Sequence, residues 1–369
     1  MAHARDISSP FAPSLHEPHG HAPTSAPIPW VFNLEATAVL LIVGGQLLAM
    51  LGAVGALPTE AVAQWLSDCL VPLQGPILFF CLGYLYQRFN TVRTCTAWGA
   101  FMKREAVVLL VPFAVFTVLA LVANTIVGRE PGISPLSLVM ALFVQPLEPL
   151  GYLYTAFLLL AITPTVKSRR NAQGLFLAAA LIKIVMVGLL TVPATTAAAL
   201  NLPYALVSVA ENWVWMTGGM ALSLLRAVPL LRSREKAWAL GALWIAASVI
   251  TFMVGGIGEP SYAVLDAIGI LWAVSLFATA FRQGRQNAFF AFIDTYTLAF
   301  FLMGGPFIAL GAGLVAAMGL SGAGASLAFA LVGLIAGFVL PPLAQKGLAR
   351  AGKALWIMYP ARFFSEPTQ

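Results

Sequence analysis

Two polar side chains lie in the first apolar run of the chain, where a membrane-spanning helix should carry none. Glu35 and Gln46 both fall within residues 29–51 and are eleven positions apart. At 3.6 residues per turn this is almost three turns, so both side chains share one helical face, roughly 16 Å apart along the axis. A carboxylate or carboxamide facing lipid is costly, so this face looks inward. It is either a buried polar pair that fixes helix packing or the wall of an active site.

Further charged side chains fall within or beside other apolar segments. They are Glu148, Lys183, Glu211, Asp266 and Asp294. An isolated charge at membrane depth costs at least about 2.5–3.5 kcal/mol, so each is expected to have a partner or water. Glu211 and Asp294 are flanked by other hydrogen-bonding residues, which suits either a polar substrate path or helix–helix hydrogen bonds. The sequence assigns no role to Lys183, Glu211 or Asp266.

The composition defines the class of protein. Hydrophobic residues make up 60% of the 369 residues and charged residues only 9%, and the mean hydropathy is +0.88. Soluble domains contain roughly a quarter charged residues. We therefore predict an all-α, polytopic integral membrane protein. The net charge of +6 comes from Lys and Arg clustered in short loops, as expected for cytoplasmic loops, and it does not indicate nucleic-acid binding.

Apolar runs between charged loops predict about ten transmembrane helices. The runs are 29–53, 70–89, 105–128, 149–166, 174–197, 203–225, 237–257, 261–281, 289–315 and 325–345. Lys and Arg follow each even-numbered run, whereas Arg129 is the exception in otherwise bare odd-numbered loops. Under the positive-inside rule, this alternation places both termini in the cytoplasm.

Three parts of the chain differ in composition. Residues 1–28 are rich in Pro, Ser, Ala and His and predict a disordered cytoplasmic tail. Residues 29–347 form the ten-helix domain, and residues 348–369 a cytoplasmic C-terminal tail. Within the domain, 135–144 is apolar but too short to cross the membrane, which predicts a re-entrant or interfacial helix. The following segment, Gln145-Pro146-Leu147-Glu148-Pro149, is expected to hold the Glu148 carboxylate on a rigid elbow at the outer face.

The residue types of common soluble active sites are missing from the membrane body. All four histidines lie in the N-terminal tail, and the sequence has no GxSxG elbow, no phosphate-cradling glycine loop and no HExxH pair. The three cysteines have no metal-ligand spacing, so no metal site is predicted.

Several motifs resemble one known family. Trp30-Val31-Phe32-Asn33-Leu34-Glu35 is similar to W-x-D-N-L-R, and residues 76–85 are similar to P-L-F-F-F-x-S-G-F-L. Further matches are Phe101-Met102-Lys103-Arg104 with 109–113, Leu150-Gly151-Tyr152-Leu153, Trp215-Met216-Thr217-Gly218-Gly219, and Thr297-Leu298-Ala299-Phe300-Phe301-Leu302. Together they resemble the acyltransferase-3 family of bacterial integral-membrane O-acyltransferases, and the resemblance runs across most of the ten predicted spans.

The departures from this family concern its chemistry. The family has Arg at the position of Glu35, His at the position of Gln46 and a later His at the position of Gly304. Transfer of an acyl group from a thioester to a hydroxyl needs a general base, for which His is the usual choice and Gln is unable to serve. Either another carboxylate (Glu35, Glu148 or Asp294) replaces it beside Gln46, or the chain is a family member without catalysis.

The resemblance implies a function for the chain. It would move an acyl group, chiefly acetyl, from a cytoplasmic acyl-CoA to a sugar hydroxyl of an exported polysaccharide, with cellulose or a related exopolysaccharide as the acceptor we favour. The acyl-CoA would be a co-substrate, with no bound cofactor, and the site would lie in the bacterial inner membrane. Lys103 and Arg104 are candidates for binding the donor phosphates, although positive-inside topology accounts for the pair equally well.

Two alternatives remain from the sequence. A catalytically degenerate relative would act as an accessory or conduit subunit of a polysaccharide or lipid export complex, alongside a polysaccharide synthase or export proteins. An unrelated transporter would show two similar halves with Gly- or Pro-broken helices in matching positions, and the sequence has no such repeat.

Overall fold

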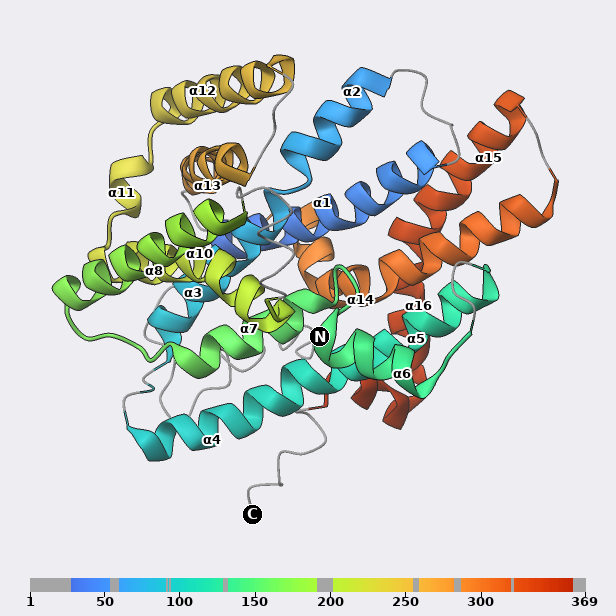
Figure 1. The fold of residues 1–369 in the computed structure, drawn as a ribbon, viewed down its shortest axis with the longest axis horizontal. Coiled ribbons are helices and arrows are strands. Elements are labelled where there is room, and N and C mark those ends of the chain that lie inside the picture. The colour runs from blue at the N-terminus through green and yellow to red at the C-terminus, as the bar shows by residue number, and fades with distance from the viewer. Residues whose placement is uncertain are drawn as a thin grey trace. The chain divides into compact units, whose positions relative to one another are not determined.

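The computed structural model describes residues 28–53, 60–90, 92, 94–128, 132–190, 202–254, 259–281, 287–319 and 322–360. The predicted N-terminal tail therefore lies almost wholly outside the described residues. Throughout these ranges the secondary structure is helical, with no strand. The helices are α1 (Pro29–Ala53), α2 (Glu60–Trp65), α3 (Gln74–Phe89), α4 (Cys95–Glu105), α5 (Val111–Ile126), α6 (Pro135–Val139), α7 (Gly151–Ile162), α8 (Arg169–Leu190), α10 (Tyr204–Leu225), α11 (Val228–Leu231), α12 (Arg234–Met253), α13 (Glu259–Ala280), α14 (Ala288–Ala317), α15 (Gly322–Leu334) and α16 (Leu340–Arg350) (Figure 1).

Short π-helical segments lengthen several of these helices. Ala106–Leu110 joins α4 to α5, and Ile335–Val339 joins α15 to α16. Leu66–Leu70 follows α2, and Met140–Val144 extends α6. A 3-10 helix, Gly352–Ile357, contacts α5 near the end of the described chain.

Eight helical stretches in the described part of the chain are long and apolar enough to cross a membrane. They are Pro29–Ala53, Leu66–Phe89, Cys95–Ile126, Arg169–Leu189, Arg234–Met253, Ser261–Ala280, Ala288–Ala317 and Gly324–Arg350. The prediction of an all-α, multi-pass membrane protein is confirmed at this level.

Two of the ten expected spans are not among these eight. The run 149–166 contains α7, which has only 12 residues and is about 18 Å long, shorter than the ~30 Å hydrocarbon core. The run 203–225 is the 22-residue α10, which is long enough but carries Glu211, Asn212 and several hydroxyl side chains. Helix α10 packs against both α3 and α8, so much of its surface faces protein and its polar residues need not face lipid.

The chain folds as two compact units. The first comprises Met1–Ala38, Asp68–Phe101 and Leu158–Thr295, and its closest helix pair is α3 with α10. Glycines allow this approach: a Cβ on Gly83 would overlap the backbone of Met216, and one on Gly219 would overlap the backbone of Phe80. Small residues that bring backbones together are typical of membrane helix pairs, where lipid gives little hydrophobic drive for association.

Helices α12 and α13 form a second pair in the same unit and lie side by side in Figure 1. The indole rings of Trp244 and Trp272 stack with centroids 5.3 Å apart. The Ser275 hydroxyl donates to the Leu231 carbonyl at 2.6 Å, which fixes α11 against α13. This bond satisfies a hydroxyl that would otherwise be costly within an apolar helix.

The second unit comprises Val39–Ser67, Met102–Phe157 and Tyr296–Gln369. Within it, glycines of α14 and α15 lie against α1: a Cβ on Gly304 would be 2.9 Å from Val43, and Gly333 faces Leu47. Aromatic pairs join α7 to its neighbours. Phe113 and Tyr154 stack at 5.7 Å, and Tyr152 and Phe301 meet edge to face at 5.8 Å.

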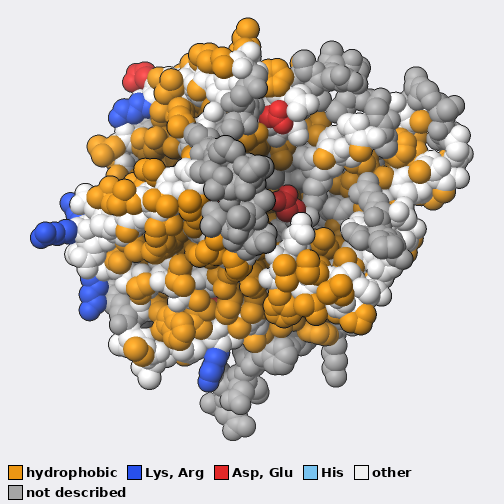
Figure 2. Space-filling view, viewed as in Figure 1, with side chains coloured by type: hydrophobic (Ala, Val, Ile, Leu, Met, Phe, Trp, Pro, Cys, Tyr) orange, Lys and Arg blue, Asp and Glu red, His pale blue; other side chains and the backbone are white. Residues whose placement is uncertain are grey.

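The outer surface is apolar, as a lipid-facing surface must be. Hydrophobic side chains cover much of the described surface in Figure 2, with Lys and Arg near the edges of the view. Large side chains such as Trp238 and Met253 are 80% and 78% exposed. In the predicted interfacial segment, Pro135–Val144 is indeed helical, begins with a Ser134–Ser137 capping box, and exposes Leu136 and Phe143. A short helix with exposed apolar side chains suits the membrane interface.

Candidate functional site

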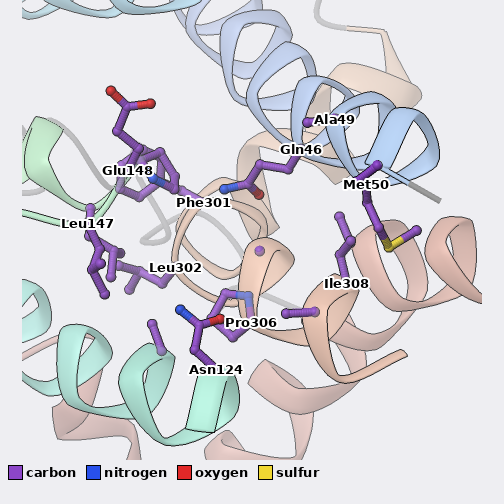
Figure 3. Close-up of a pocket in the computed structure, with 16 residues that line it drawn as sticks. Gln46, Ala49, Met50, Asn124, Leu147, Glu148, Phe301, Leu302, Pro306 and Ile308 are labelled. Carbon is purple, nitrogen blue, oxygen red and sulfur yellow. The ribbon is translucent and has the colours of Figure 1, made fainter. Parts of the chain in front are cut away.

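The second unit contains a cavity of about 440 Å³ with three polar side chains in its lining. These are Gln46 from α1, Asn124 from α5 and Glu148 from the Pro-rich elbow, and we call the space the amide cavity (Figure 3). The remaining lining is apolar and includes Phe301 and Pro306 of α14. An apolar pocket of this size with a few convergent polar groups is the usual form of a small-molecule site.

Gln46 is held against a glycine of the facing helix. A Cβ on Gly305 would lie 2.8 Å from Nε2 and 2.9 Å from Oε1 of Gln46, so only a residue without a side chain leaves room for the carboxamide there. The Oε1 atom is buried and accepts no hydrogen bond from the part of the chain that the structure describes. A buried acceptor without a donor costs about 1–3 kcal/mol, and a ligand hydroxyl or amine in the cavity would remove that cost.

Asn124 and Glu148 approach the cavity from two other elements. Asn124 lies in the last turn of α5, two residues before the end of the helix at Ile126, and its amide points toward Pro306 in Figure 3. Glu148 is solvent-exposed, and its carboxylate points away from Gln46 and Asn124 in this view. It is therefore a group at the rim of the cavity. A change of rotamer would be needed for the carboxylate to face a bound ligand.

The two other predicted catalytic residues lie elsewhere. Glu35 is only 2% exposed and lies in the first unit, as does the half-buried Asp294. Neither lines the amide cavity. Glu35 and Gln46 are indeed on one continuous helix, α1, and their eleven-residue separation corresponds to about 16 Å, so one small ligand cannot contact both at hydrogen-bond distance.

Asn33 is a second buried amide near Glu35. It is fully buried, and neither its Oδ1 nor its Nδ2 has a hydrogen-bond partner among the described residues. The sequence resemblance includes this residue, but no cavity described in the first unit is lined by it.

The candidate donor-binding pair is far from the cavity. Lys103 is exposed and Arg104 half-buried in the last turn of α4. Residues Cys95–Ile126 form one helical stretch, and Arg104 precedes Asn124 by twenty residues, or about 30 Å. This is about the thickness of the hydrocarbon core, so the pair and the cavity lie near opposite ends of this helical stretch.

The sequence interpretation missed Asn124 and the role of Gly305. An Asn near the end of the third apolar run is the signal that could have identified Asn124. Gly305 belongs to a Gly-Gly pair that sequence alone does not distinguish from ordinary helix packing, because the Gln46 amide that it accommodates comes from a distant segment.

Comparisons with protein-family models, with curated proteins and with solved structures gave no match to this chain. The helices and the amide cavity therefore carry the argument about function. They define a multi-pass membrane protein, helical throughout its described secondary structure, with a largely apolar cavity in its second unit that three polar side chains line.

Proposed function

We propose that the chain is a membrane-bound O-acyltransferase, similar to the acyltransferase-3 family, that binds a sugar hydroxyl in the amide cavity. The observation that carries the proposal is the buried Oε1 of Gln46, which needs a hydrogen-bond donor and faces a cavity large enough for a small ligand. A sugar hydroxyl is such a donor, and Asn124 supplies a second amide for a neighbouring hydroxyl. Phe301 offers an apolar surface to the sugar ring.

The chemistry assigns a role to each polar group. The Glu148 carboxylate takes the proton of the acceptor hydroxyl as its oxygen attacks the thioester carbonyl carbon. The new C–O bond forms, the C–S bond breaks, and the CoA thiolate leaves and is protonated from solvent. Gln46 and Asn124 orient the acceptor and are not proton carriers. Catalytic hydrogen bonds are often incomplete without substrate, which fits a Glu148 side chain that turns inward only when an acceptor binds.

The proposal includes a membrane topology that fits this division of labour. In the proposed arrangement ten helices cross the bacterial inner membrane and both termini are cytoplasmic, with α7 and α10 as the two less typical spans. Lys103 and Arg104 then face cytoplasmic acyl-CoA, and the amide cavity faces the outside, where an exported polysaccharide such as cellulose would be the acceptor. Because about 30 Å separates the two ends, the thioester arm of the donor has to extend into the helical bundle.

The same separation favours a second candidate. If the donor cannot reach the cavity, the chain would bind polysaccharide without modifying it, as an accessory or conduit subunit beside a polysaccharide synthase or export proteins. The absence of histidine from the membrane body is consistent with this function.

A transfer assay separates the two. The protein in lipid nanodiscs is incubated with radiolabelled acetyl-CoA and glucan oligosaccharides, and labelled oligosaccharide is measured beside acetyl-CoA binding. Transfer abolished by Glu148→Gln and retained by Glu235→Gln supports the enzyme, because Glu235 is an exposed carboxylate in the other unit. Oligosaccharide binding with neither acetyl-CoA binding nor transfer supports the accessory subunit and contradicts the enzyme.

A further inference from the structure

The first unit contains a second, chemically different space. It is a groove of about 550 Å³ between α3, α8, α10, α11 and α13, lined almost wholly by apolar side chains including Phe80, Phe176, Leu231 and Leu271. Phe176 and Leu177 are partly exposed, so the groove has an open, apolar side. We call it the lipid groove. It shares no residue with the amide cavity.

The depth of the groove matches one leaflet of a bilayer. Along α10 its lining runs from Val214 to Leu225, the last residue of that helix, which is about 16 Å. Along α8 the lining begins at Gln173, one turn from the start of the helix. The groove therefore starts at helix ends and stops near half the ~30 Å hydrocarbon core. Its dimensions suit an acyl chain of a lipid in that leaflet.

Cations gather at the end where these helices stop. Arg226 directly follows Leu225, and Arg232 directly follows the groove residue Leu231. Arg88 and Arg232 both act electrostatically on Tyr84, which lies one turn of α3 beyond the groove residue Phe80. Arg232 therefore follows the groove lining directly in the chain, and it lies within electrostatic range of α3, which also lines the groove.

Arg232 has an unused donor in this position. Its Nε is buried, and it donates to no acceptor within the described segments. Nearby Lys236, by contrast, donates to the Leu230 carbonyl, and the only acidic residue between 226 and 240, Glu235, accepts from Ser233. A buried guanidinium donor beside an open apolar groove fits a phosphate, which Arg binds with paired hydrogen bonds.

We propose that the lipid groove binds an anionic phospholipid, with one acyl chain along α10 and the headgroup phosphate at Arg232. Burial of an acyl chain in the groove gives little preference for one lipid over another, because the surrounding lipid tails are as apolar as the groove. Selectivity must therefore come from the phosphate and from the net charge of the headgroup. Each cation near an anionic membrane surface changes affinity by about fivefold, and several act together here. This inference rests only on the first unit and is independent of the proposed acyl transfer.

Native mass spectrometry of the detergent-purified full chain tests the proposal, with titrations of phosphatidylglycerol and phosphatidylcholine of equal chain length. We expect tighter binding of phosphatidylglycerol by at least tenfold. Arg232→Gln should remove most of this preference, whereas Arg234→Gln, which loses the same charge but follows no groove residue, should remove clearly less of it. Equal affinity for the two lipids in the parent, or equal losses in both variants, would overturn the proposal.

A second variant tests binding of the lipid acyl chain rather than binding of the headgroup. Leu271→Trp adds volume to the groove and should lower the affinity for both lipids severalfold, while glycerol 3-phosphate should not compete at millimolar concentration. Full competition by glycerol 3-phosphate would indicate a plain anion site and contradict lipid binding. If Leu271→Trp fails to fold, shortening the acyl chains of phosphatidylglycerol in the parent gives the same information.

Discussion

The Gln46 carboxamide lies on the bare face of Gly305, where a Cβ would come within 2.9 Å of both its polar atoms. This contact between α1 and α14 fixes where the amide enters the cavity.

Gly305→Ala should displace the Gln46 amide with little loss of stability, because the colliding atoms are the far end of a flexible side chain. We expect acyl transfer to fall about tenfold through misorientation of the acceptor. Gly44→Ala is the matched control, because it lies on the same helix as Gln46 with nothing within 4 Å of its Cβ position. Equal activity in both variants would show that the amide position is unimportant for transfer.

Gln46→Leu should separate stability from activity. The Gln46 carboxamide oxygen is buried and receives no hydrogen bond within the described ranges, so removing it should raise the free energy of unfolding by about 1 kcal/mol. Acyl transfer should fall, because the sugar hydroxyl loses its hydrogen-bond partner. Thermal unfolding in detergent and the transfer assay measure the two effects. Gln74→Leu provides the comparison, because its Oε1 is also buried and without a partner among the described residues but lies outside the cavity. It should stabilise the protein without lowering transfer.

Glu148→Gln tests the proposed base. A general base contributes about 10²–10⁴-fold to rate, so kcat should fall by that factor while acceptor binding changes little. Glu148→Asp, which keeps the carboxylate but shortens it, should retain more activity than the Gln variant. A Glu148→Gln protein with unchanged kcat would remove Glu148 from the mechanism and direct attention to Glu35 and Asp294.

Lys103→Ala tests binding of the acyl-CoA donor. Lys103 lies in the helical stretch Cys95–Ile126, at the opposite end from the cavity residue Asn124. Loss of one cation at the proposed phosphate site should raise KM for acetyl-CoA severalfold and leave kcat nearly unchanged, since the side chain is far from the reacting atoms. The control is Lys167→Ala, another exposed lysine with the same charge change. An equal rise of KM in the control would indicate a general effect of surface charge.

Hydrophobic run lengths were sufficient to predict most of the fold. The spans around Glu35 and Asp294 match α1 and α14, and the short run 135–144 is a helix. The exceptions have physical causes. Run length cannot show that α7 stops after 12 residues, and it cannot show that α10 is sheltered by α3 and α8, which makes its Glu211 tolerable.

The candidate site was predictable only in part, because it depends on contacts between distant segments. Gln46 and Glu148 were identified as polar groups in unusual surroundings, and they do line one cavity. Their grouping with Asn124, and the separation of Glu35 and Asp294 from them, depends on how α1, α5 and α14 pack. The sequence of one chain does not contain that information in a readable form, since no single segment encodes it.

Gly83→Ala should be the most damaging single methyl addition in the first unit. Its new Cβ would overlap the Met216 carbonyl, which belongs to the backbone of a rigid helix and cannot move aside like a side chain. Overpacking of this kind costs about 1–3 kcal/mol or more, so the midpoint of thermal unfolding should fall by several degrees. Gly174→Ala on α8 has nothing within 4 Å of the added methyl and should be neutral or slightly stabilising, because Ala favours helix over Gly by about 1 kcal/mol. Similar unfolding midpoints for the two variants would show that α3 and α10 do not meet at Gly83.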